Sequence, residues 1–440
     1  MKNLSNTNRH ILILLFLSTL FFILGNWVIL LTSPDEGKNA FAVFYFLKTH
    51  QFLIPYYNCH PRFEKPPMLY WIAAIFAKIF GLNAFSLRLV SGLSAVGIVI
   101  FTYLIVKEIF EEEKAFKCAL ILLTIPHFWI ESRAFTPEML LNLFSVGSVY
   151  FFLTKRIFWA WLFLALGFLT KGPVGVILPL AIVIAFKLSI KRDLKLVSLK
   201  GLLTFFIVGS SWYAFMLIHF GLSYFYKFFV KENILRFTGK AKMHLYPWYY
   251  YLEVLTVCMA FYLPAYFKAL PRISKLLSLK KTELFNSKTF PFVAWFLIVL
   301  VFYSLSKGKL HHYILLCYPP LALMTSELIS YKYLKGVFVI STFFLCFLIF
   351  TLHFYESKRF TPLALKILKN DSHKPVIFLR NEVTALPFYL KKCIPKVFQV
   401  PKEFRGYVIT RDFKNLSIKG CKLVLKAPEF GKTYGLFRCP

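Results

Sequence analysis

Charged residues with the types and spacing of a transfer site gather in the first polar stretch of this 440-residue chain. Asp35, Glu36 and Lys38 stand directly after the first apolar run, and Glu64 and Lys65 follow just before a pair of prolines. A carboxylate can take a proton from an attacking group or steady positive charge at an anomeric carbon. Ammonium groups can neutralise a phosphate. The same residues also suit ordinary helix starts, where acids and proline are favoured, so both interpretations remain open.

Three later loops carry similar groups. Their residues are Glu131, Arg133 and Glu138 in one short loop, Lys171 at a Gly-Pro turn, and Lys307, Lys309, His311, His312 and Tyr313 at a third. Adjacent histidines point to different faces of a helix, which favours an interfacial pair over a zinc triad. HExxH, GxSxG, GxGxxG and Walker A spacings are absent, so zinc peptidase, esterase, dinucleotide and ATPase chemistry have no support.

Composition identifies the elements that must position these groups. The chain is 58% hydrophobic and 19% aromatic, with a mean hydropathy of +0.62, whereas soluble domains are about 45–50% apolar. Ile11–Leu31 has about the ~20 residues that cross a bilayer and lacks a small-residue cleavage site. The sequence therefore predicts a polytopic membrane protein whose first run is a retained helix.

The repeated apolar runs predict about 11 transmembrane helices. Besides Ile11–Leu31 they lie near Leu87–Ile109, Ala115–Ile130, Met139–Leu153, Ile157–Leu169, Val174–Leu188, Val197–Phe220, Trp248–Leu270, Phe290–Leu305, Tyr313–Ile329 and Tyr333–Phe354. Met68–Phe80 is too short for a comfortable span and predicts an interfacial helix in the first outside loop. From about residue 355, short β-like runs at 376–379, 407–410 and 423–425 predict a small α/β domain. We expect an all-α transmembrane domain over 1–354 and this second domain over 355–440.

Loop charge predicts the orientation. The net charge is +33, but the basic residues are dispersed among short loops, which favours membrane lipids over nucleic acid as partners. With a cytoplasmic N-terminus most of these residues fall inside, and Asp35 and the C-terminal domain fall on the periplasmic side of an inner membrane. Two outside segments are nevertheless basic, the first loop and Gly221–Tyr246, which contains Arg236. Phosphate binding would explain them, although long loops also tolerate positive charge.

Seven of the eight cysteines fall into two groups. Cys118, Cys258, Cys317 and Cys346 lie in apolar runs and are expected to be small core residues. Cys393, Cys421 and Cys439 lie in the tail, where one disulfide can form if the tail is extracytoplasmic. No spacing typical of a metal-binding cysteine motif occurs.

Several of these segments, in order from about residue 10 to 330, resemble the ArnT family, the 4-amino-4-deoxy-L-arabinose lipid A transferases within the protein mannosyltransferase-like GT-C glycosyltransferases. They are Asp35-Glu36-Gly37-Lys38, Phe63-Glu64-Lys65-Pro66-Pro67, Arg88, Leu169-Thr170-Lys171-Gly172-Pro173, Arg236-Phe237, His244 before Pro247-Trp248, and Ser306-Lys307-Gly308-Lys309-Leu310 leading to Tyr313. The resemblance implies a GT-C fold and an outward-opening site that takes a sugar from undecaprenyl phosphate with inversion.

The resemblance also implies roles for individual residues. Asp35 matches the catalytic carboxylate. Glu64 and His244 resemble positions of a metal ion in the family, so a divalent metal ion is a candidate cofactor and none is certain. Glu138 stands where the family commonly has aspartate. The candidate catalytic residues are Asp35, Glu64 and Glu138, and the candidate substrate- and phosphate-binding residues are Lys38, Lys65, Arg88, Lys171, Arg236, Lys307, Lys309 and Tyr313.

The function predicted from all of this is transfer of a sugar from a polyprenyl-phosphate donor to a lipid or glycolipid acceptor such as lipid A. The chain is shorter than typical ArnT proteins and carries glutamate at position 138, which leaves the sugar and the acceptor open. One alternative is a protein O-mannosyltransferase-like enzyme. Another is a flippase for lipid-linked sugars, which would place ionisable residues at mid-span and show inverted repeats. The acids here stand at span ends on one side, which favours an enzyme.

Overall fold

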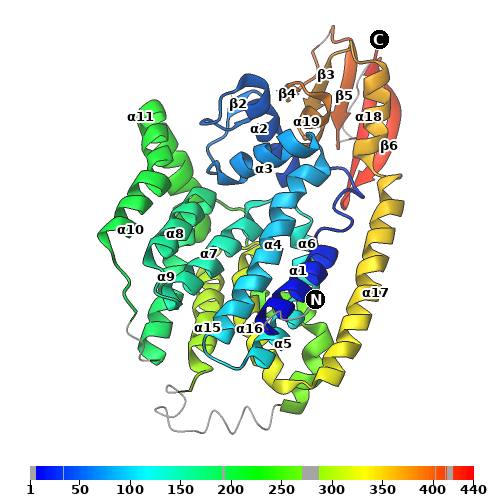
Figure 1. Ribbon diagram of the computed structural model, residues 1–440. Helices are drawn as coiled ribbons and strands as arrows, with labels where there is room; N and C mark the ends of the chain where they lie inside the picture. Colours follow the sequence, from blue (N-terminus) through cyan, green and yellow to red (C-terminus); the bar gives the residue numbers. More distant parts are fainter. Residues whose placement is uncertain are drawn as a thin grey trace.

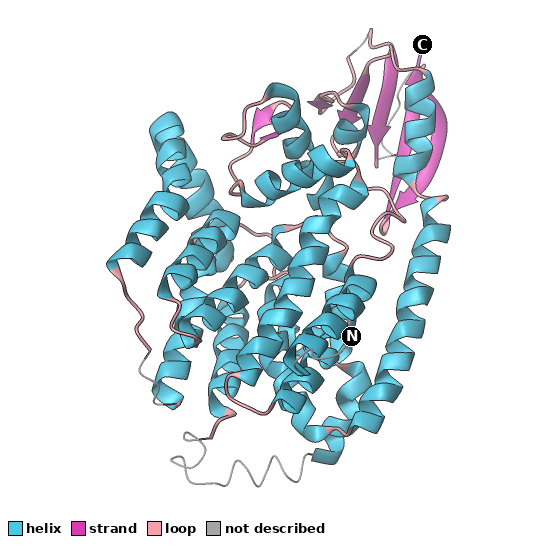
Figure 2. Ribbon diagram, viewed as in Figure 1, coloured by secondary structure: helices cyan, strands magenta, loops and turns pink. Residues whose placement is uncertain are grey.

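The computed structural model describes residues 6–32, 34–190, 194–269, 287–401, 403–411, 413 and 420–440. Most of the chain forms a body of packed helices, and a smaller region of helices and strands that includes the C-terminus lies at one end of that body (Figures 1 and 2). The predicted loop lysines and arginines at 191, 192, 272, 275, 280 and 281 lie outside the described residues.

The helices of the body follow the predicted runs closely. They are α1 (Asn6–Phe22), α2 (Asp35–Thr49), α3 (Met68–Phe80), α4 (Ala84–Lys107), α5 (Glu112–Leu123), α6 (Pro126–Ser132), α7 (Pro137–Leu153), α8 (Ile157–Lys171), α9 (Val174–Ser189), α10 (Leu199–Thr204), η1 (Phe205–Ser210), α11 (Ser211–Phe225), η2 (Tyr226–Leu235), α12 (Tyr250–Cys258), η3 (Ala260–Tyr262), α15 (Phe290–Leu305), η4 (His311–Cys317), α16 (Tyr318–Leu328) and α17 (Tyr331–Glu356). A mostly helical fold is therefore confirmed.

Length and composition single out fewer spans than the sequence predicts. Among the described residues, three helices are long and apolar enough to cross a membrane, or five if each of two bent pairs is one span. Five further apolar helices have 10–17 residues. The total of about 11 spans stays a prediction.

Three predicted spans are not continuous helices. The run expected at Trp248–Leu270 is bent by 68° between Tyr250–Cys258 and Ala260–Ala269. The run expected at Ala115–Ile130 is broken into α5 and α6, which meet at 65° where Pro126 starts the second helix; proline lacks the N–H that would continue the first. The expected Ile11–Leu31 span is also too long, because α1 ends at Phe22 and the following residues form turns around Gly25, whose φ is +84°.

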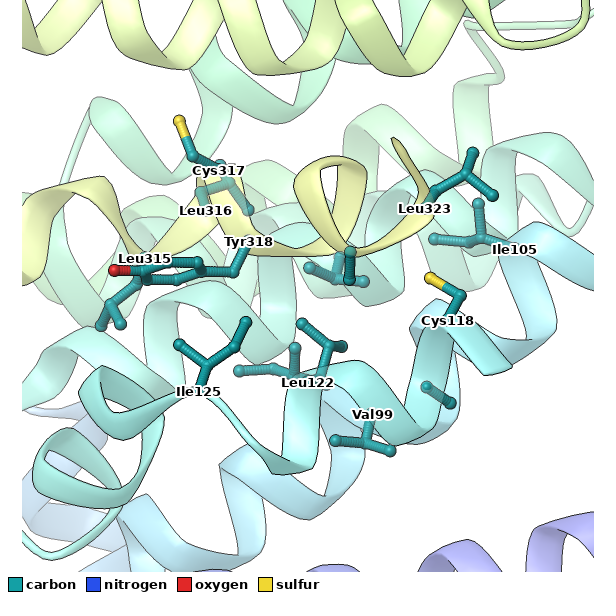
Figure 3. Packing of buried hydrophobic residues seen from close by; sticks show 14 of the residues in the cluster. Val99, Ile105, Cys118, Leu122, Ile125, Leu315, Leu316, Cys317, Tyr318 and Leu323 are labelled. Carbon is teal, nitrogen blue, oxygen red and sulfur yellow. The ribbon is translucent and has the colours of Figure 1, made fainter. Parts of the chain in front are cut away.

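The packed centre of the body joins segments far apart in the sequence. Figure 3 shows Tyr318, Leu315 and Leu316 from the η4–α16 segment against Leu122 near the end of α5 and Ile125 at the α5–α6 break. These side chains are almost fully buried. The end of η4 and the start of α16 are therefore held against the α5–α6 break by a closely packed apolar cluster.

The C-terminal region is a mixed sheet with helices beside it. Its elements are α18 (Phe360–Asn370), β3 (Val376–Leu379), α19 (Leu386–Leu390), β4 (Lys396–Val397), β5 (Gly406–Thr410), β6 (Lys422–Glu429) and β7 (Lys432–Cys439). The strand order is β4-β3-β5-β7-β6; β3 pairs parallel with β4 and β5, whereas β7 pairs antiparallel with β5 and β6. The predicted β-like runs thus form strands.

Two disulfides occur where the sequence predicted one. Cys421 and Cys439 join the neighbouring strand ends, and Cys393 pairs with Cys59. Cys59 lies at the tight turn between β1 (Tyr56–Tyr57) and β2 (His60–Pro61), where Asn58 and Cys59 both have positive φ, as a type I′ hairpin requires. The first loop is therefore covalently tied to the C-terminal region across 334 residues of sequence.

Candidate active site

The first turn of α2 divides its two acids between opposite environments. Asp35 is exposed, whereas Glu36 is 3% exposed. Successive helical residues are rotated by about 100°, so neighbours cannot face the same side. Gly37 lets the backbone of Thr384 and Ala385 approach α2, because a Cβ there would lie 2.4 Å from their atoms. The C-terminal region is thus placed directly over the turn that carries Asp35.

Glu36 anchors this turn to the body of the protein. Its carboxylate accepts hydrogen bonds from Nε and Nη2 of Arg88, each at 2.7 Å, and from the backbone N–H groups of Phe135 at 2.7 Å and Thr32 at 2.8 Å. Burial would raise the pKa of Glu36, but Arg88 and these N–H groups together hold it below its usual range. The pair is the kind of buried, fully hydrogen-bonded ion pair that fixes local structure.

The guanidinium of Arg88 donates its hydrogen bonds to acceptors within the protein. Besides Glu36, its guanidinium donates to the backbone carbonyls of Asn26, Ile29 and Leu30, and it is 2% exposed. These contacts stabilise the turns after α1. They give no support to the predicted role of Arg88 in substrate binding.

A buried polar cluster forms the floor beneath Asp35. Asn39, one turn after Asp35 on α2, accepts hydrogen bonds from Arg62 at 2.7 Å and from the hydroxyl of Tyr70 at 3.2 Å. Arg62 also pairs with Glu64 at 3.3 Å. Burial would lower the pKa of Arg62, but Tyr70, Glu64 and Asp35 raise it, so this guanidinium stays charged. A permanent positive charge therefore lies close to the Asp35 carboxylate.

Asp35, Lys38 and Lys65 are the charged groups of this region with no partner. Among the described residues, none of the three makes a hydrogen bond or ion pair; Lys38 only lies over the Tyr57 ring, at 5.6 Å. Lys38 lines a pocket of about 560 Å³ between the first loop and the C-terminal region, together with Arg62, Glu64, Glu382 and Lys396. A carboxylate and two ammonium groups are therefore available to a ligand.

A second group lies at the ends of α7, α8 and η4. Lys171 donates to Glu138 at 2.9 Å, and its Nζ lies 3.9 Å from the centre of the Tyr313 ring. The guanidinium of Arg236 lies over the same ring at 5.9 Å. A pocket of about 110 Å³ is lined by Lys171, Arg236 and Tyr313. The structure thus brings together four residues that the sequence proposed separately.

The two lysines of the Ser306–Leu310 segment have different environments. Lys309 is 2% exposed and donates to the backbone carbonyls of Ser306 and Tyr246, so it holds this loop to the segment before α12. Lys307 is exposed. Gly308 allows the backbone of Arg236 to pass close by, because a Cβ there would lie 2.7 Å from its carbonyl oxygen.

The residues that resemble a metal position do not form a metal site of their own. Glu64 and His244 are both exposed, and Glu64 is engaged with Arg62. Within the described ranges, neither belongs to a group of three potential ligands. The candidate ion at this pair is therefore not supported by the donor set, and no chemical step is assigned to it.

Sequence reasoning overlooked the floor residues Asn39 and Tyr70, and it counted Arg62 only among the basic residues of the first loop. Asn39 follows Asp35 at the helical spacing of four, which could have placed both on one face. Arg62 gives no such signal, because only the folded loop brings it beneath α2. The separation of Glu36 from Asp35 also depends on Arg88, 52 residues further on.

Comparison with known proteins adds five findings, three from sequence and two from solved structures. A family model described as dolichyl-phosphate-mannose-protein mannosyltransferase matches residues 64–215. An uncharacterized protein of Aquifex aeolicus is 44% identical over 427 residues, which cover 96% of this chain and 97% of that protein. Undecaprenyl phosphate-alpha-4-amino-4-deoxy-L-arabinose arabinosyl transferase 1 of Pseudomonas fluorescens is 30% identical over 339 residues. That match covers 72% of this chain but 59% of the transferase, so the chain spans little more than half of this relative.

The fold is shared with solved structures. ArnT from Cupriavidus metallidurans bound to undecaprenyl phosphate superposes with a TM-score of 0.79 at 15% identity, over 98% of both chains. The oligosaccharyltransferase AglB of Archaeoglobus fulgidus gives a TM-score of 0.53 at 12% identity, over 92% of this chain and 69% of that one. Both likenesses concern the fold, and the first extends over the C-terminal region as well.

Proposed function

We propose that this chain is an ArnT-like GT-C glycosyltransferase that moves a sugar from a polyprenyl phosphate, such as undecaprenyl phosphate, to a lipid-linked acceptor such as lipid A. One observation carries the proposal. Asp35, Lys38 and Lys65 are charged, reachable and unpaired among the described residues, while Glu36 and Arg88 hold the turn that presents Asp35.

The proposed reaction is a single displacement at the anomeric carbon, which inverts its configuration. An acceptor oxygen forms the new bond to this carbon, and the bond from the carbon to the donor phosphate oxygen breaks. The phosphate leaves with the bonding electron pair, and Lys38 and Lys65 stabilise the charge that develops on it. If the acceptor is a hydroxyl, Asp35 takes its proton. If the acceptor is an ionised phosphate, no proton is released and Asp35 offsets positive charge at the sugar.

The second group of residues suits the same substrate. Arg236 and Lys171 border one pocket with the Tyr313 ring, and paired cations of this kind bind phosphate. Glu138 fixes the ammonium of Lys171 at 2.9 Å. We assign Glu138 to positioning in this proposal, and Arg236 to contact with a phosphate of the donor or acceptor.

The site is proposed to face the periplasm across the inner membrane, with a cytoplasmic N-terminus. Two observations support this side. The loop lysines and arginines favour it, and the two disulfides, Cys59–Cys393 and Cys421–Cys439, lie in the regions placed there. Disulfides form and persist in extracytoplasmic compartments. The four remaining cysteines are free.

A protein acceptor is the second candidate, favoured by the family model whose description names protein mannosyltransferases. The pocket of about 560 Å³ above Lys38 is open enough to admit either a lipid headgroup or a peptide segment. A hydroxyl acceptor on protein would need Asp35 as a base, whereas a lipid A phosphate would not. The acceptor that becomes labelled, lipid A or peptide, therefore separates the two.

The test is sugar transfer by the purified full chain in detergent. Radiolabelled polyprenyl-phosphate sugars are offered with lipid A or with a Ser/Thr peptide, and Asp35→Asn is compared with Glu111→Gln, an exposed acid before α5. With a hydroxyl acceptor, Asp35→Asn should reduce kcat by about 10²–10⁴-fold, and Glu111→Gln should have no effect. Movement of the sugar lipid across vesicles without transfer, unchanged by Asp35→Asn, would overturn the proposal in favour of a flippase.

A further inference from the structure

Two histidines and a glutamate meet where α6 and η4 touch, outside the groups assigned above. His127 and Glu131 stand one turn apart on α6, and His311 is the first residue of η4. Nε2 of His127 lies 3.1 Å from Nδ1 of His311. Oε1 of Glu131 lies 3.3 Å from Nδ1 of His311 and 3.9 Å from Nε2 of His127. Three potential ligand atoms thus face one another from two elements.

The spacing of these three atoms matches a metal-centred arrangement. A triangle with sides of 3.1, 3.3 and 3.9 Å has a circumscribed circle of radius about 2.0 Å, and Zn²⁺ binds imidazole nitrogen at about 2.0–2.1 Å and carboxylate oxygen at about 2.0–2.2 Å. One ion could therefore reach all three atoms from a point close to their plane.

The surroundings also favour a cation at this point. Glu131 is 2% exposed, and within the described part of the chain its carboxylate has imidazoles as its only near polar partners, since it accepts no hydrogen bond from a backbone N–H or a hydroxyl. A third imidazole, that of His312, has its Nδ1 4.0 Å from Oε2 of Glu131. A buried carboxylate of this kind is costly unless a positive charge compensates it.

His127 is oriented from behind. Its Nδ1 lies 2.8 Å from the hydroxyl of Tyr318, and Tyr318 belongs to the packed apolar cluster of Figure 3. If Nδ1–H donates to that hydroxyl, Nε2 carries the lone pair, and Nε2 is the atom that faces His311 and Glu131. Partners of this type fix the tautomer and the ring orientation of metal-binding histidines.

We propose that His127, Glu131 and His311 bind one divalent transition-metal ion of the zinc class. Two imidazoles and one carboxylate form a ligand set that suits zinc. His127 and Glu131 are buried, whereas the side chain of His311 is 50% exposed, so the fourth position opens on the His311 side. Water, or a phosphate or hydroxyl oxygen of a substrate, would occupy it.

The proposed ion would lie next to the pocket of Lys171 and Tyr313. The chain of contacts runs from Glu131 to His312, and from Nε2 of His312 to Oε1 of Glu138 at 3.4 Å. Glu138 in turn accepts from Lys171. The metal site is separate from the Glu64 and His244 pair, and it does not depend on the proposed glycosyl transfer.

The competing explanation is a proton. One imidazole could donate to the other in the 3.1 Å contact, and an imidazolium could neutralise Glu131 without any metal. This arrangement would use the same distances, so the test must measure metal itself.

The experiment measures zinc and cobalt bound to the full chain in detergent after removal of metal with EDTA. We expect one tightly bound Zn²⁺ per chain by elemental analysis, and visible Co²⁺ absorption typical of four-coordinate geometry. His311→Ala, His127→Ala and Glu131→Gln should each abolish that signal. Tyr318→Phe should weaken Zn²⁺ affinity by about 10-fold or more. His353→Ala, an exposed histidine on α17, is the matched control and should bind as the wild type does.

Three outcomes would overturn the proposal. The first is no stoichiometric Zn²⁺ in a wild type that is folded by gel filtration. The second is Zn²⁺ retained by His311→Ala, the least buried position, and lost instead in the Glu64→Ala/His244→Ala double variant. The third is wild-type thermal stability that responds to pH but not to added Zn²⁺ or EDTA, as an imidazolium would give.

Discussion

Replacing Glu36 by glutamine removes the negative charge that Arg88 faces and leaves the shape of the side chain almost unchanged. In the wild type, Oε1 accepts from Nε of Arg88 and from the N–H of Phe135, and Oε2 accepts from Nη2 of Arg88 and from the N–H of Thr32. Glutamine keeps one acceptor oxygen and puts an NH₂ group where the other stood. The NH₂ group of the glutamine would then face one N–H donor of Arg88 and one backbone N–H group, with no acceptor between them.

The expected cost follows from this geometry. Removing one partner of a buried, hydrogen-bonded ion pair destabilises a protein by about 3–5 kcal/mol. Arg88 keeps three backbone carbonyls as acceptors, which favours the lower end, about 3 kcal/mol. Native proteins are stable by about 5–15 kcal/mol, so this change should be large. Activity should fall as well, because the same turn presents Asp35.

The assay is reversible unfolding of the purified protein in mixed micelles, with sugar transfer measured on the same samples. Glu111→Gln, which changes an exposed acid without a side-chain capping bond, should shift the free energy of unfolding by no more than about 0.5 kcal/mol. Asp35→Asn should lose activity at unchanged stability. A Glu36→Gln loss below about 1 kcal/mol would refute the view that this pair anchors the site.

Three further predictions follow from the same geometry. The pKa of Glu36 is held low against burial, so wild-type stability should be full above pH 4.5 and decline as the pH falls towards the lowered pKa, whereas the Glu36→Gln protein should show a flatter acid limb in pH-dependent unfolding. Lys38→Met and Lys65→Met should each lower kcat/KM for the polyprenyl-phosphate donor by about tenfold, since one charge-assisted hydrogen bond contributes about 1.5 kcal/mol; an unchanged kcat/KM would remove that lysine from the phosphate site. Cys59→Ser breaks the link to Cys393 and should lower the free energy of unfolding by about 2–5 kcal/mol relative to the wild type without reductant. Unfolding of both proteins is measured with and without reductant. Equal stability of the variant and the wild type without reductant would contradict the prediction.

Helix positions in the body could be read closely from the sequence. Phe290–Leu305 was expected and found without change, and α8 and α9 begin at the predicted residues, Ile157 and Val174. Apolar runs bounded by charges, glycine or proline mark such helices directly. The break between α5 and α6 was missed, because its only local signal was Pro126 inside a run that hydropathy treats as continuous.

The sequence could indicate which residues gather at the candidate site, but it could not indicate which of them bind a ligand and which stabilise the protein. Asp35, Lys38 and Lys65 remain available to a ligand, as expected, and Lys171, Arg236 and Tyr313 do converge. Charge and spacing could not show which of these side chains form hydrogen bonds within the protein and are therefore not available to a ligand. Lys309 and Arg88 look equivalent to Lys38 in the sequence, yet backbone carbonyls occupy both.

The sequence by itself determined that the chain is a helical membrane protein and that many of its acids and lysines stand near the ends of the apolar runs. These properties depend on local composition and spacing. Only the tertiary structure decided that Glu36 turns inward while Asp35 stays free, that Cys59 bonds Cys393, and that His127, Glu131 and His311 meet. Helical spacing fixes which residues share a face, whereas the burial of that face depends on partners 50 to more than 300 residues away.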